Sequence, residues 1–510
     1  MAVVDNSRSF APVVPKVQGA VSGQTRTKLH WSVKVYLFLV VLPFAFSLGP
    51  VVLTGIRFLM VFLFVQMFTK VFSGKLDKVY PVDYLFLGHV IWIVGSMLVN
   101  NPTQVVQYSG ATALEFLGGY LLGRTYIRSK QDMIAMFRFA AFLVVCTLPL
   151  ALYETLTGDP LLVKLMAALP IIDGADKVYS PPRMGLDRVQ MGFASPIHYG
   201  LYCTLAYSAC FVGLRNVTSG FVRLFSAMVI GLCVFFSLSS GALLPLMMQS
   251  FLIGWDKAFR SSKSRWWLLF GFFVFCYVTI DLLSNRTPYR VFMTYATFSP
   301  ATAYYRAAIN EYGMNNVWMH PLFGNGLNGW VRPNWLHGNS VDNFWLLTAM
   351  RHGIPAFLLV ATGYCMALLQ VLRKNLGSDP VLESLRLSWL FTMACIGFTL
   401  VTVHVWTEIY SYVFFFVGSA IWMIGVQPGE PGTVPDLAPD LASDPRKGSR
   451  AKRPLAPLGQ AIARSGNLYS RAHPTATRDR EPSPSRKDLA IKTEPEKAPR
   501  YSRFPAKERE

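Results

Sequence analysis

The sequence predicts an all-α polytopic membrane protein with about twelve transmembrane helices, because its apolar runs reach the length that spans a hydrocarbon core, about twenty residues. The chain has 510 residues, of which 52% are hydrophobic, and a positive mean hydropathy, more than one soluble core would use. Glycine and proline inside several runs do not oppose this, since neighbouring helices satisfy the freed backbone groups. The runs centre near Leu39, Val61, Ile91, Phe116, Val144, Leu205, Ile230, Met247, Phe272, Leu359, Phe391 and Phe416.

Basic residues predict the orientation of these helices. Residues 1–32 are too long and loosely charged for the lead of a cleavable signal peptide, so we expect them to stay in the cytoplasm. Residues 33–426 form the transmembrane domain, with both termini cytoplasmic and two large outer loops at about 155–196 and 283–341. The cations then expected on the cytoplasmic side are Lys70, Lys75, Lys78, Arg124, Arg128, Lys130, Arg215, Arg223, Lys257, Arg260, Lys263, Arg265, Arg373 and Lys374.

Residues 427–510 are rich in Pro, Ser, Ala and basic side chains, which predicts a disordered basic cytoplasmic tail. It holds part of the net charge of +20, which favours contact with the anionic inner leaflet. Interspersed Asp and Glu favour a solvated tail over a nucleic-acid site. The seven cysteines all fall in apolar runs, which indicates packing rather than disulfides. No metal or nucleotide motif is present, so we expect no cofactor.

The outer loops retain cations against the positive-inside tendency. They are Lys164, Lys177, Arg183, Arg188, Arg286, Arg290, Arg306 and Arg332. Guanidinium groups bind phosphate oxygens bidentately, so two or three of them converging would hold a pyrophosphate. The alternative for each is an ion pair with a neighbouring Asp or Glu.

Aromatic residues accompany these cations. Trp330 and Trp335 bracket Arg332 in a turn rich in Gly, Pro and Asn, where the backbone can approach a ligand closely. The rings would serve either as platforms under sugar rings or as anchors in the membrane interface.

Three side chains of the second loop are candidate proton acceptors: His320, His337 and Asp342. His337 has a suitable intrinsic pKa, whereas Asp342 would need partial burial to raise its pKa. The alternative for Asp342 is capping of the helix that follows. Inside the apolar runs, Glu115 is the carboxylate expected to make a buried interhelical hydrogen bond. Further ionisable groups lie at His89, Asp281, His404 and Glu408.

Four segments together resemble the O-antigen ligase and polysaccharide polymerase-like family of bacterial inner-membrane glycosyltransferases, nearest to its exopolysaccharide-polymerase-like members. They are RMGLDRVQMGFASPIHYG, YYRAAINEYG, HPLFGNGLNGW and SVDNFWLLTAMRHGIPAF, within roughly residues 183–422. The resemblance implies a metal-independent GT-C-type helical enzyme of the inner membrane that uses a glycan on undecaprenyl pyrophosphate at the periplasmic face. The acceptor would be a sugar hydroxyl.

The resemblance also implies site residues. The family pattern maps onto Arg306, residues 321–326, residues 342–346 and residues 353–355. Asp342 stands where ligases usually carry a histidine, so the base is either Asp342 or His337. The family's upstream arginine maps onto Arg183 or Arg188, and Arg332 is a further candidate for the pyrophosphate. The residues expected to bind sugar are Trp330, Trp335 and Asn343.

The leading interpretation is transfer or polymerisation of a lipid-linked glycan in surface or exopolysaccharide assembly. Pyrophosphate is a good leaving group, so arginines can neutralise the developing charge without a metal. The implied partners are the undecaprenyl-pyrophosphate-linked donor, a glycan acceptor, the lipid bilayer and polysaccharide assembly or export proteins. The first alternative is a transporter or flippase of lipid-linked oligosaccharide, which needs a polar path or discontinuous helices near the midplane. The second is a non-catalytic membrane scaffold.

Overall fold

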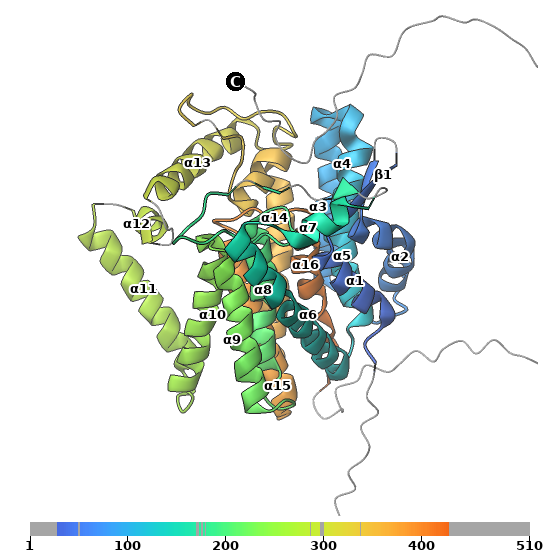
Figure 1. The fold of residues 1–510 in the computed structure, drawn as a ribbon, viewed down its shortest axis with the longest axis vertical. Helices are drawn as coiled ribbons and strands as arrows, with labels where there is room; N and C mark the ends of the chain where they lie inside the picture. Colours follow the sequence, from blue (N-terminus) through green and yellow to red (C-terminus); the bar gives the residue numbers. More distant parts are fainter. Residues whose placement is uncertain are drawn as a thin grey trace, which may run out of the picture. The chain divides into compact units, whose positions relative to one another are not determined.

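The computed structural model describes residues 28–48, 51–169, 173–174, 177–178, 180–285, 287–295, 300–336 and 338–427 (Figure 1). It divides the chain into two units, Met1–Pro439 and Asp440–Glu510. All the described residues lie in the first unit. The predicted tail beyond residue 427 and the predicted N-terminal segment up to residue 27 lie outside the described residues.

Each predicted apolar run lies on a helix. Among the described residues, seven helices are long and apolar enough to cross a membrane: α2, α3, α6, α11, α14, α15, and α16 together with η4 (Ile421–Gly425). This indicates a multi-pass helical membrane protein, and the count of twelve spans stays a prediction. The helices on the runs are α1 (Trp31–Val41), α2 (Gly55–Phe72), α3 (Pro81–Asn100), α4 (Val105–Thr112) continued by the π-helical η2 (Ala113–Leu117) and α5 (Gly118–Tyr126), α6 (Lys130–Thr157), α8 (Pro196–Ser208) continued by the π-helical η3 (Ala209–Gly213), α9 (Gly220–Phe236), α10 (Ser240–Ala258), α11 (Arg265–Leu283), α14 (Phe344–Arg373), α15 (Pro380–Thr399) and α16 (Thr407–Gly418).

The segments expected to be loops contain regular structure. The first carries α7 (Leu161–Ala167) and β3 (Asp173–Gly174), and the second carries α12 (Pro288–Tyr295) and α13 (Pro300–Met319). A short 3-10 turn, η1 (Pro102–Gln104), joins α3 to α4.

A small antiparallel sheet accompanies the helices of this mostly helical fold. Its strands β1 (Phe44–Leu48) and β2 (Val51–Thr54) lie between α1 and α2, and the strand order is β2-β1-β3. Their aromatic and β-branched composition favours strand. Pairing of Ala45 with Asp173 ties the first outer segment to the α1–α2 connection.

Helix starts follow local capping chemistry. The Ser129 hydroxyl accepts from the backbone N–H of Asp132 at the start of α6, and the Asp379 carboxylate accepts two N–H groups at the start of α15. Pro196 follows the capping residue Ser195 at the start of α8. These side chains satisfy backbone donors that lack an intrahelical partner.

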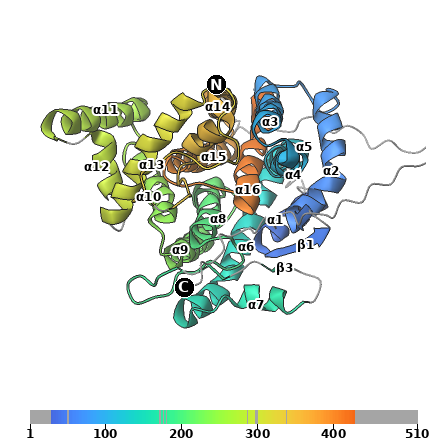
Figure 2. The same cartoon turned by 90° about the horizontal axis from the view of Figure 1, so that it is seen from above.

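Glycines bring α5 and α16 into close contact (Figure 2). A Cβ atom on Gly123 would lie 2.3 Å from the Phe415 carbonyl oxygen, and one on Gly418 would lie 2.1 Å from that of Tyr120. Small residues let the two helix backbones approach closely. The resulting packing contacts stabilise the helix pair in lipid, where the hydrophobic effect does not drive helices together.

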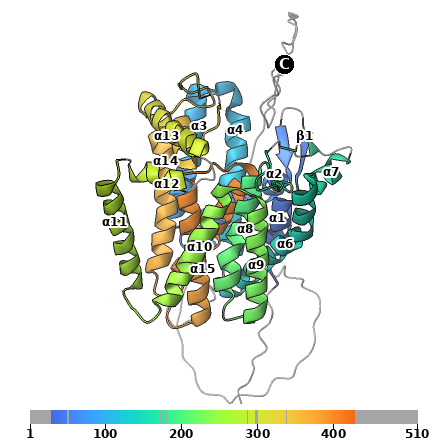
Figure 3. The ribbon, with the colours of Figure 1, turned by 60° about the vertical axis from the view of Figure 1, so that its left-hand side comes forward.

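The connections that carry the expected cytoplasmic cations meet at one end of the bundle, called the basic end below (Figure 3). Lys130 Nζ lies 2.8 Å from Asp379 Oδ2, which joins the starts of α6 and α15. The Arg138 guanidinium donates to the Val217 carbonyl oxygen at 2.7 Å, which joins α6 to the connection between η3 and α9. The opposite end carries the sheet, α7 and α13, and is called the site end below.

We predict that the basic end faces the cytoplasm. Cysteine placed at Lys75 should then react with a membrane-impermeant thiol reagent only after the inner membrane is opened. Cysteine at the exposed Val331 should react in intact spheroplasts. The seven native cysteines, all free, would be replaced first. The reverse labelling pattern would show that the orientation is wrong.

Candidate functional site

The segment of α12, α13 and the loop up to α14 folds back as a small cap over the start of α14. Its apolar centre is shared by α13, the following loop and α14. Asn316 fixes the loop, because its amide donates to the Val331 carbonyl oxygen and accepts from the Val331 N–H, both at 2.8 Å. The buried residues of this centre are Ile309, Val317, Trp330, Leu336, Val341, Leu346, Leu347, Ala349 and Met350.

A kink in α14 receives the loop that follows α13. Gly353 adopts a φ of 82°, and a Cβ there would lie 1.8 Å from the Leu322 carbonyl oxygen. The N–H groups of Asn325 and Gly326 bond to the carbonyl oxygens of Met350 and Arg351. The interrupted helix is therefore completed by this loop.

Helix α3 closes the same junction. Trp92 Nε1 donates to the carbonyl oxygens of Leu322 and His352, at 3.2 and 3.1 Å. The Ser96 hydroxyl donates to the Phe323 carbonyl oxygen at 2.6 Å. The glycine and proline positions of the family-like pattern, residues 321–326 and 353–355, thus have a structural role: they join the cap to the bundle.

The structure brings Arg306 and Asp342 together. Arg306 Nε lies 3.9 Å from Asp342 Oδ2, with the arginine side chain 8% exposed and the aspartate 43% exposed. A charge-assisted hydrogen bond measures about 2.7–2.9 Å. The contact between Arg306 and Asp342 is therefore an ion pair longer than a charge-assisted hydrogen bond.

The capping role considered for Asp342 belongs to its neighbour. The Asn343 side-chain oxygen accepts from the Leu346 N–H at 3.0 Å, and Asn343 is the N-cap residue of α14. Asp342 lies one position before this N-cap residue. Asn343 was expected to bind sugar. That role stays a prediction, while the observed role of its oxygen is capping.

Desolvation raises the pKa of Asp342 above its ordinary range, and the Arg306 charge opposes this shift. The carboxylate side chain remains 43% exposed, so water still screens its charge. The direction matches what a general base at this position requires.

Arg183 and Arg188 form a second cationic pair at the junction of α9 and α10. Arg183 Nη1 donates to the Leu238 carbonyl oxygen at 2.8 Å, and Arg188 Nε donates to that of Ser237 at 3.4 Å. Desolvation, together with the Arg183 charge, lowers the pKa of Arg188 to about 10. Two half-buried guanidinium groups that repel each other favour a bound anion.

A buried carboxylate that sequence reasoning missed positions this pair. Glu154, near the end of α6, accepts from the Gln190 N–H at 2.7 Å and from the Met191 N–H at 3.1 Å. It thereby fixes the backbone immediately after Arg188. In the sequence, Glu154 stands at the end of an apolar run, and nothing there indicates a contact with the backbone of Gln190 and Met191.

The aromatic residues divide into a buried and an exposed group. Trp330 is 8% exposed within the cap centre, and the Arg332 guanidinium lies 5.6 Å from its ring centroid. Arg332 also bonds to the Leu336 carbonyl oxygen at 2.9 Å, so these two residues hold the loop together. Their sugar-binding and pyrophosphate-binding roles stay predictions.

Trp335 belongs to the exposed group. It lies with its ring 5.6 Å from Tyr304 and 6.3 Å from Tyr305, and these three side chains are 39%, 63% and 44% exposed. They form an exposed aromatic patch, and Tyr304 and Tyr305 directly precede Arg306 on α13.

A histidine that sequence analysis noted only as ionisable lies next to the start of α14. The ring of His404 stacks on Phe344 at 6.3 Å, and the Phe344 N–H donates to the Leu400 carbonyl oxygen at 2.9 Å. Burial and the Arg351 charge lower the pKa of His404 well below its ordinary value, which keeps the ring neutral.

Backbone strain gathers around these groups. Within the described ranges, the non-glycine residues with positive φ are Met184, Met191, Leu238 and Thr407, and Thr407 is β-branched. They lie in the segment of Arg183 and Arg188, at the α9–α10 junction, and just after His404. Such conformations are costly and tend to occur at functional sites.

His337 lies outside the described residues, and His320 is exposed on the cap. Across the described ranges, no three His, Cys, Asp or Glu side chains gather closely enough to hold a metal ion. Glu115, on the π-turn η2, accepts from Arg57 Nε at 2.8 Å, which confirms the expected interhelical hydrogen bond.

The Arg306–Asp342 pair, the Arg183–Arg188 pair and His404 all lie at the site end. In comparisons with known proteins, no protein-family model and no curated protein matches this chain. The family resemblance therefore rests on the sequence segments alone.

Proposed function

We propose that this chain is a metal-independent glycosyltransferase of the bacterial inner membrane that transfers or polymerises a glycan from an undecaprenyl-pyrophosphate-linked donor onto a sugar hydroxyl at the periplasmic face. The observation that carries the proposal is the Arg306–Asp342 pair, which sets a phosphate-binding group beside a carboxylate of raised pKa. Leaving-group stabilisation and proton removal are the two tasks that this reaction requires.

In the proposed step, the acceptor hydroxyl oxygen attacks the anomeric carbon of the lipid-linked sugar. The bond from that carbon to the pyrophosphate oxygen breaks, and undecaprenyl pyrophosphate leaves with the electron pair. Arg306 binds the charge that develops on the pyrophosphate, while Asp342 takes the hydroxyl proton. His337 is the alternative acceptor from the sequence, and His404 is the one that the structure adds.

The surroundings of the pair fit a glycan. The patch of Trp335, Tyr304 and Tyr305 provides faces on which sugar rings stack. The Arg183–Arg188 pair supplies a second anion-binding surface, held in place by Glu154. In this proposal the chain spans the membrane about twelve times, which matches the number of apolar runs.

The alternative is a transporter or flippase of lipid-linked oligosaccharide, and the break in α14 at Gly353 is the observation in its favour. The carbonyl groups freed by that break are bonded to residues 321–326 and to Trp92. They therefore do not line an open polar path, which favours transfer over transport.

One assay separates the two functions. Purified protein in vesicles would receive lipid-pyrophosphate oligosaccharide, and we expect release of undecaprenyl pyrophosphate together with a longer glycan. Translocation of the intact lipid without cleavage of the sugar–phosphate bond would support the flippase and contradict the proposal.

We predict that transfer survives chelation. The arginines provide the positive charge that a divalent ion would otherwise bring to the pyrophosphate. Turnover in EDTA should match turnover in buffer. Loss of activity that one divalent ion restores would contradict the mechanism, and a metal-dependent transferase assayed in parallel would show that chelation was complete.

A further inference from the structure

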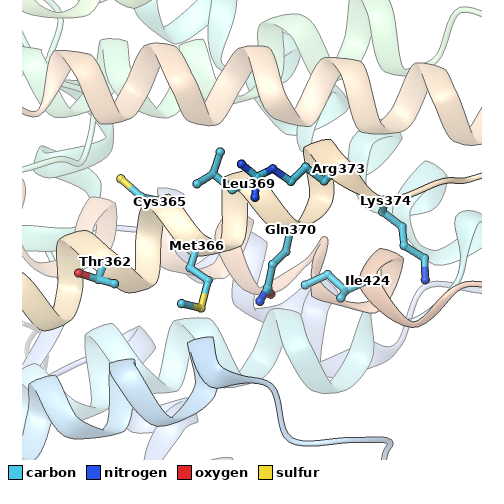
Figure 4. A pocket seen from close by; sticks show the side chains of 8 residues that line it. All are labelled: Thr362, Cys365, Met366, Leu369, Gln370, Arg373, Lys374 and Ile424. Carbon is cyan, nitrogen blue, oxygen red and sulfur yellow. The ribbon is translucent and has the colours of Figure 1, made fainter.

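A shallow open groove of about 680 Å³ runs along α14 at the basic end, away from the residues of the proposed reaction. Two rows of side chains with helical i, i+4 spacing form one wall, and Ile424 of η4 forms part of the other (Figure 4). One row contains Cys365, Leu369 and Arg373, and the other contains Thr362, Met366, Gln370 and Lys374.

Each row begins with small or apolar side chains and ends on a cation. Arg373 closes one row and Lys374 the other, at the last turn of α14. Within the described residues, neither the Arg373 guanidinium nor the Lys374 ammonium lies within salt-bridge distance of an acidic side chain. The groove is thus apolar along its length and positive at one end.

The dimensions correspond to one leaflet. From Thr362 to Lys374 the helix rises about 18 Å, at about 1.5 Å per residue. Half of a hydrocarbon core is about 15 Å thick. A chain lying along Met366 and Leu369 would therefore place its headgroup at the level of Arg373 and Lys374.

Gln370 adds a polar contact between the apolar length and the cations. Its amide oxygen is buried and has no hydrogen-bond partner among the described residues. Buried polar atoms are normally satisfied, so this atom indicates a missing donor.

We propose that this groove binds one anionic phospholipid, with an acyl chain along α14 and the phosphate at the end of α14 that carries Arg373 and Lys374. Arginine binds phosphate oxygens bidentately, and cations at the end of a membrane helix attract anionic headgroups. The site does not depend on the glycan reaction and requires only the membrane orientation of α14.

The first test measures phosphatidylglycerol binding to the purified full-length chain by native mass spectrometry, with phosphatidylcholine as the neutral probe. The double variant Arg373→Gln with Lys374→Gln should bind phosphatidylglycerol about tenfold more weakly or worse. The matched control, Lys257→Gln with Lys263→Gln, removes two exposed cations of the basic end that lie outside the groove, and should change binding less than about twofold. Equal losses in both variants would reduce the site to general surface charge and overturn the proposal.

The second test needs no charge change and uses the exposed thiol of Cys365, which lies in the groove. In a chain that keeps this cysteine alone, vesicles containing phosphatidylglycerol should slow its alkylation several-fold relative to phosphatidylcholine vesicles. A chain that keeps only Cys276, on α11, should show no such difference. Equal alkylation of Cys365 in both vesicles would contradict the proposal, whatever the outcome of the glycan-transfer assay.

Discussion

Asp342→Asn should lower glycan turnover by about 100-fold or more, which is the usual worth of a positioned base. Donor binding should stay nearly intact, because the amide keeps the shape of the carboxylate and Arg306 remains in place. The measurement is single-turnover transfer alongside equilibrium donor binding. Glu311→Gln is the matched control, since Glu311 forms an exposed ion pair with Arg290 on the same cap.

The pH dependence of the same reaction follows from the raised pKa of Asp342. The base acts when deprotonated, so activity should fall as the pH drops through a value above the ordinary aspartate range of about 4. Arg306 lowers this pKa, so Arg306→Gln should move the acid limb to higher pH. The free energy of unfolding depends on pH in the opposite direction. The folded chain binds the Asp342 proton more tightly than the unfolded chain does, so the free energy of unfolding falls as the pH rises through the pKa of Asp342.

Arg306→Lys should not restore the activity of the arginine, because a point charge cannot reproduce the planar fork on a pyrophosphate. Donor binding should weaken, in contrast to Asp342→Asn. His337→Gln and His404→Gln identify the base if Asp342 is not required. Wild-type transfer rates in Asp342→Asn, His337→Gln and their double variant would show that the mechanism proposed for this loop is wrong.

Arg124→Met should destabilise the folded chain by about 3–5 kcal/mol, the usual cost of breaking a buried ion pair by removing one partner. The Arg124 guanidinium is 1% exposed and lies 2.5 Å from Asp77 and 3.6 Å from Asp83, which is fully buried. Tyr120 donates a further hydrogen bond to Asp83. Removing the cation leaves the Asp83 charge uncompensated inside the bundle.

The comparison that tests this network is Lys130→Met. It breaks the ion pair with Asp379 at the same end, whose side chains are 23% and 28% exposed, and should cost about 1 kcal/mol or less. Thermal or denaturant unfolding in detergent would measure both. Arg124→Met combined with Asp83→Asn should recover part of the loss. Equal destabilisation by the two single substitutions would contradict a network that depends on burial.

Much of the fold could be predicted from particular residues. Each predicted apolar run lies on a helix, and Glu115 makes the buried contact that its apolar surroundings required. The small sheet and the helices α12 and α13 were not predicted. Their segments are short and lack a strong period, so pairing across the chain decides their structure.

The sequence could predict which residues belong to the candidate site, but not how they are arranged. Arg306 and Asp342 were both named, and their contact follows from the way α13 folds back on α14. Trp330 was expected to face a ligand and is buried, because the cap needed an apolar centre. Glu154 gave no sequence indication, since its partners are backbone N–H groups in a distant segment.

By itself, the sequence determined that this is a multi-pass helical membrane protein and where its helices run, because transfer into lipid and helix capping are local free energies that can be summed along the chain. Only the tertiary structure decided that Asn343 rather than Asp342 caps α14, that residues 321–326 fill the kink at Gly353, and which arginines meet. Those outcomes depend on which faces pack together, and this is set by many small contacts between segments far apart in the sequence.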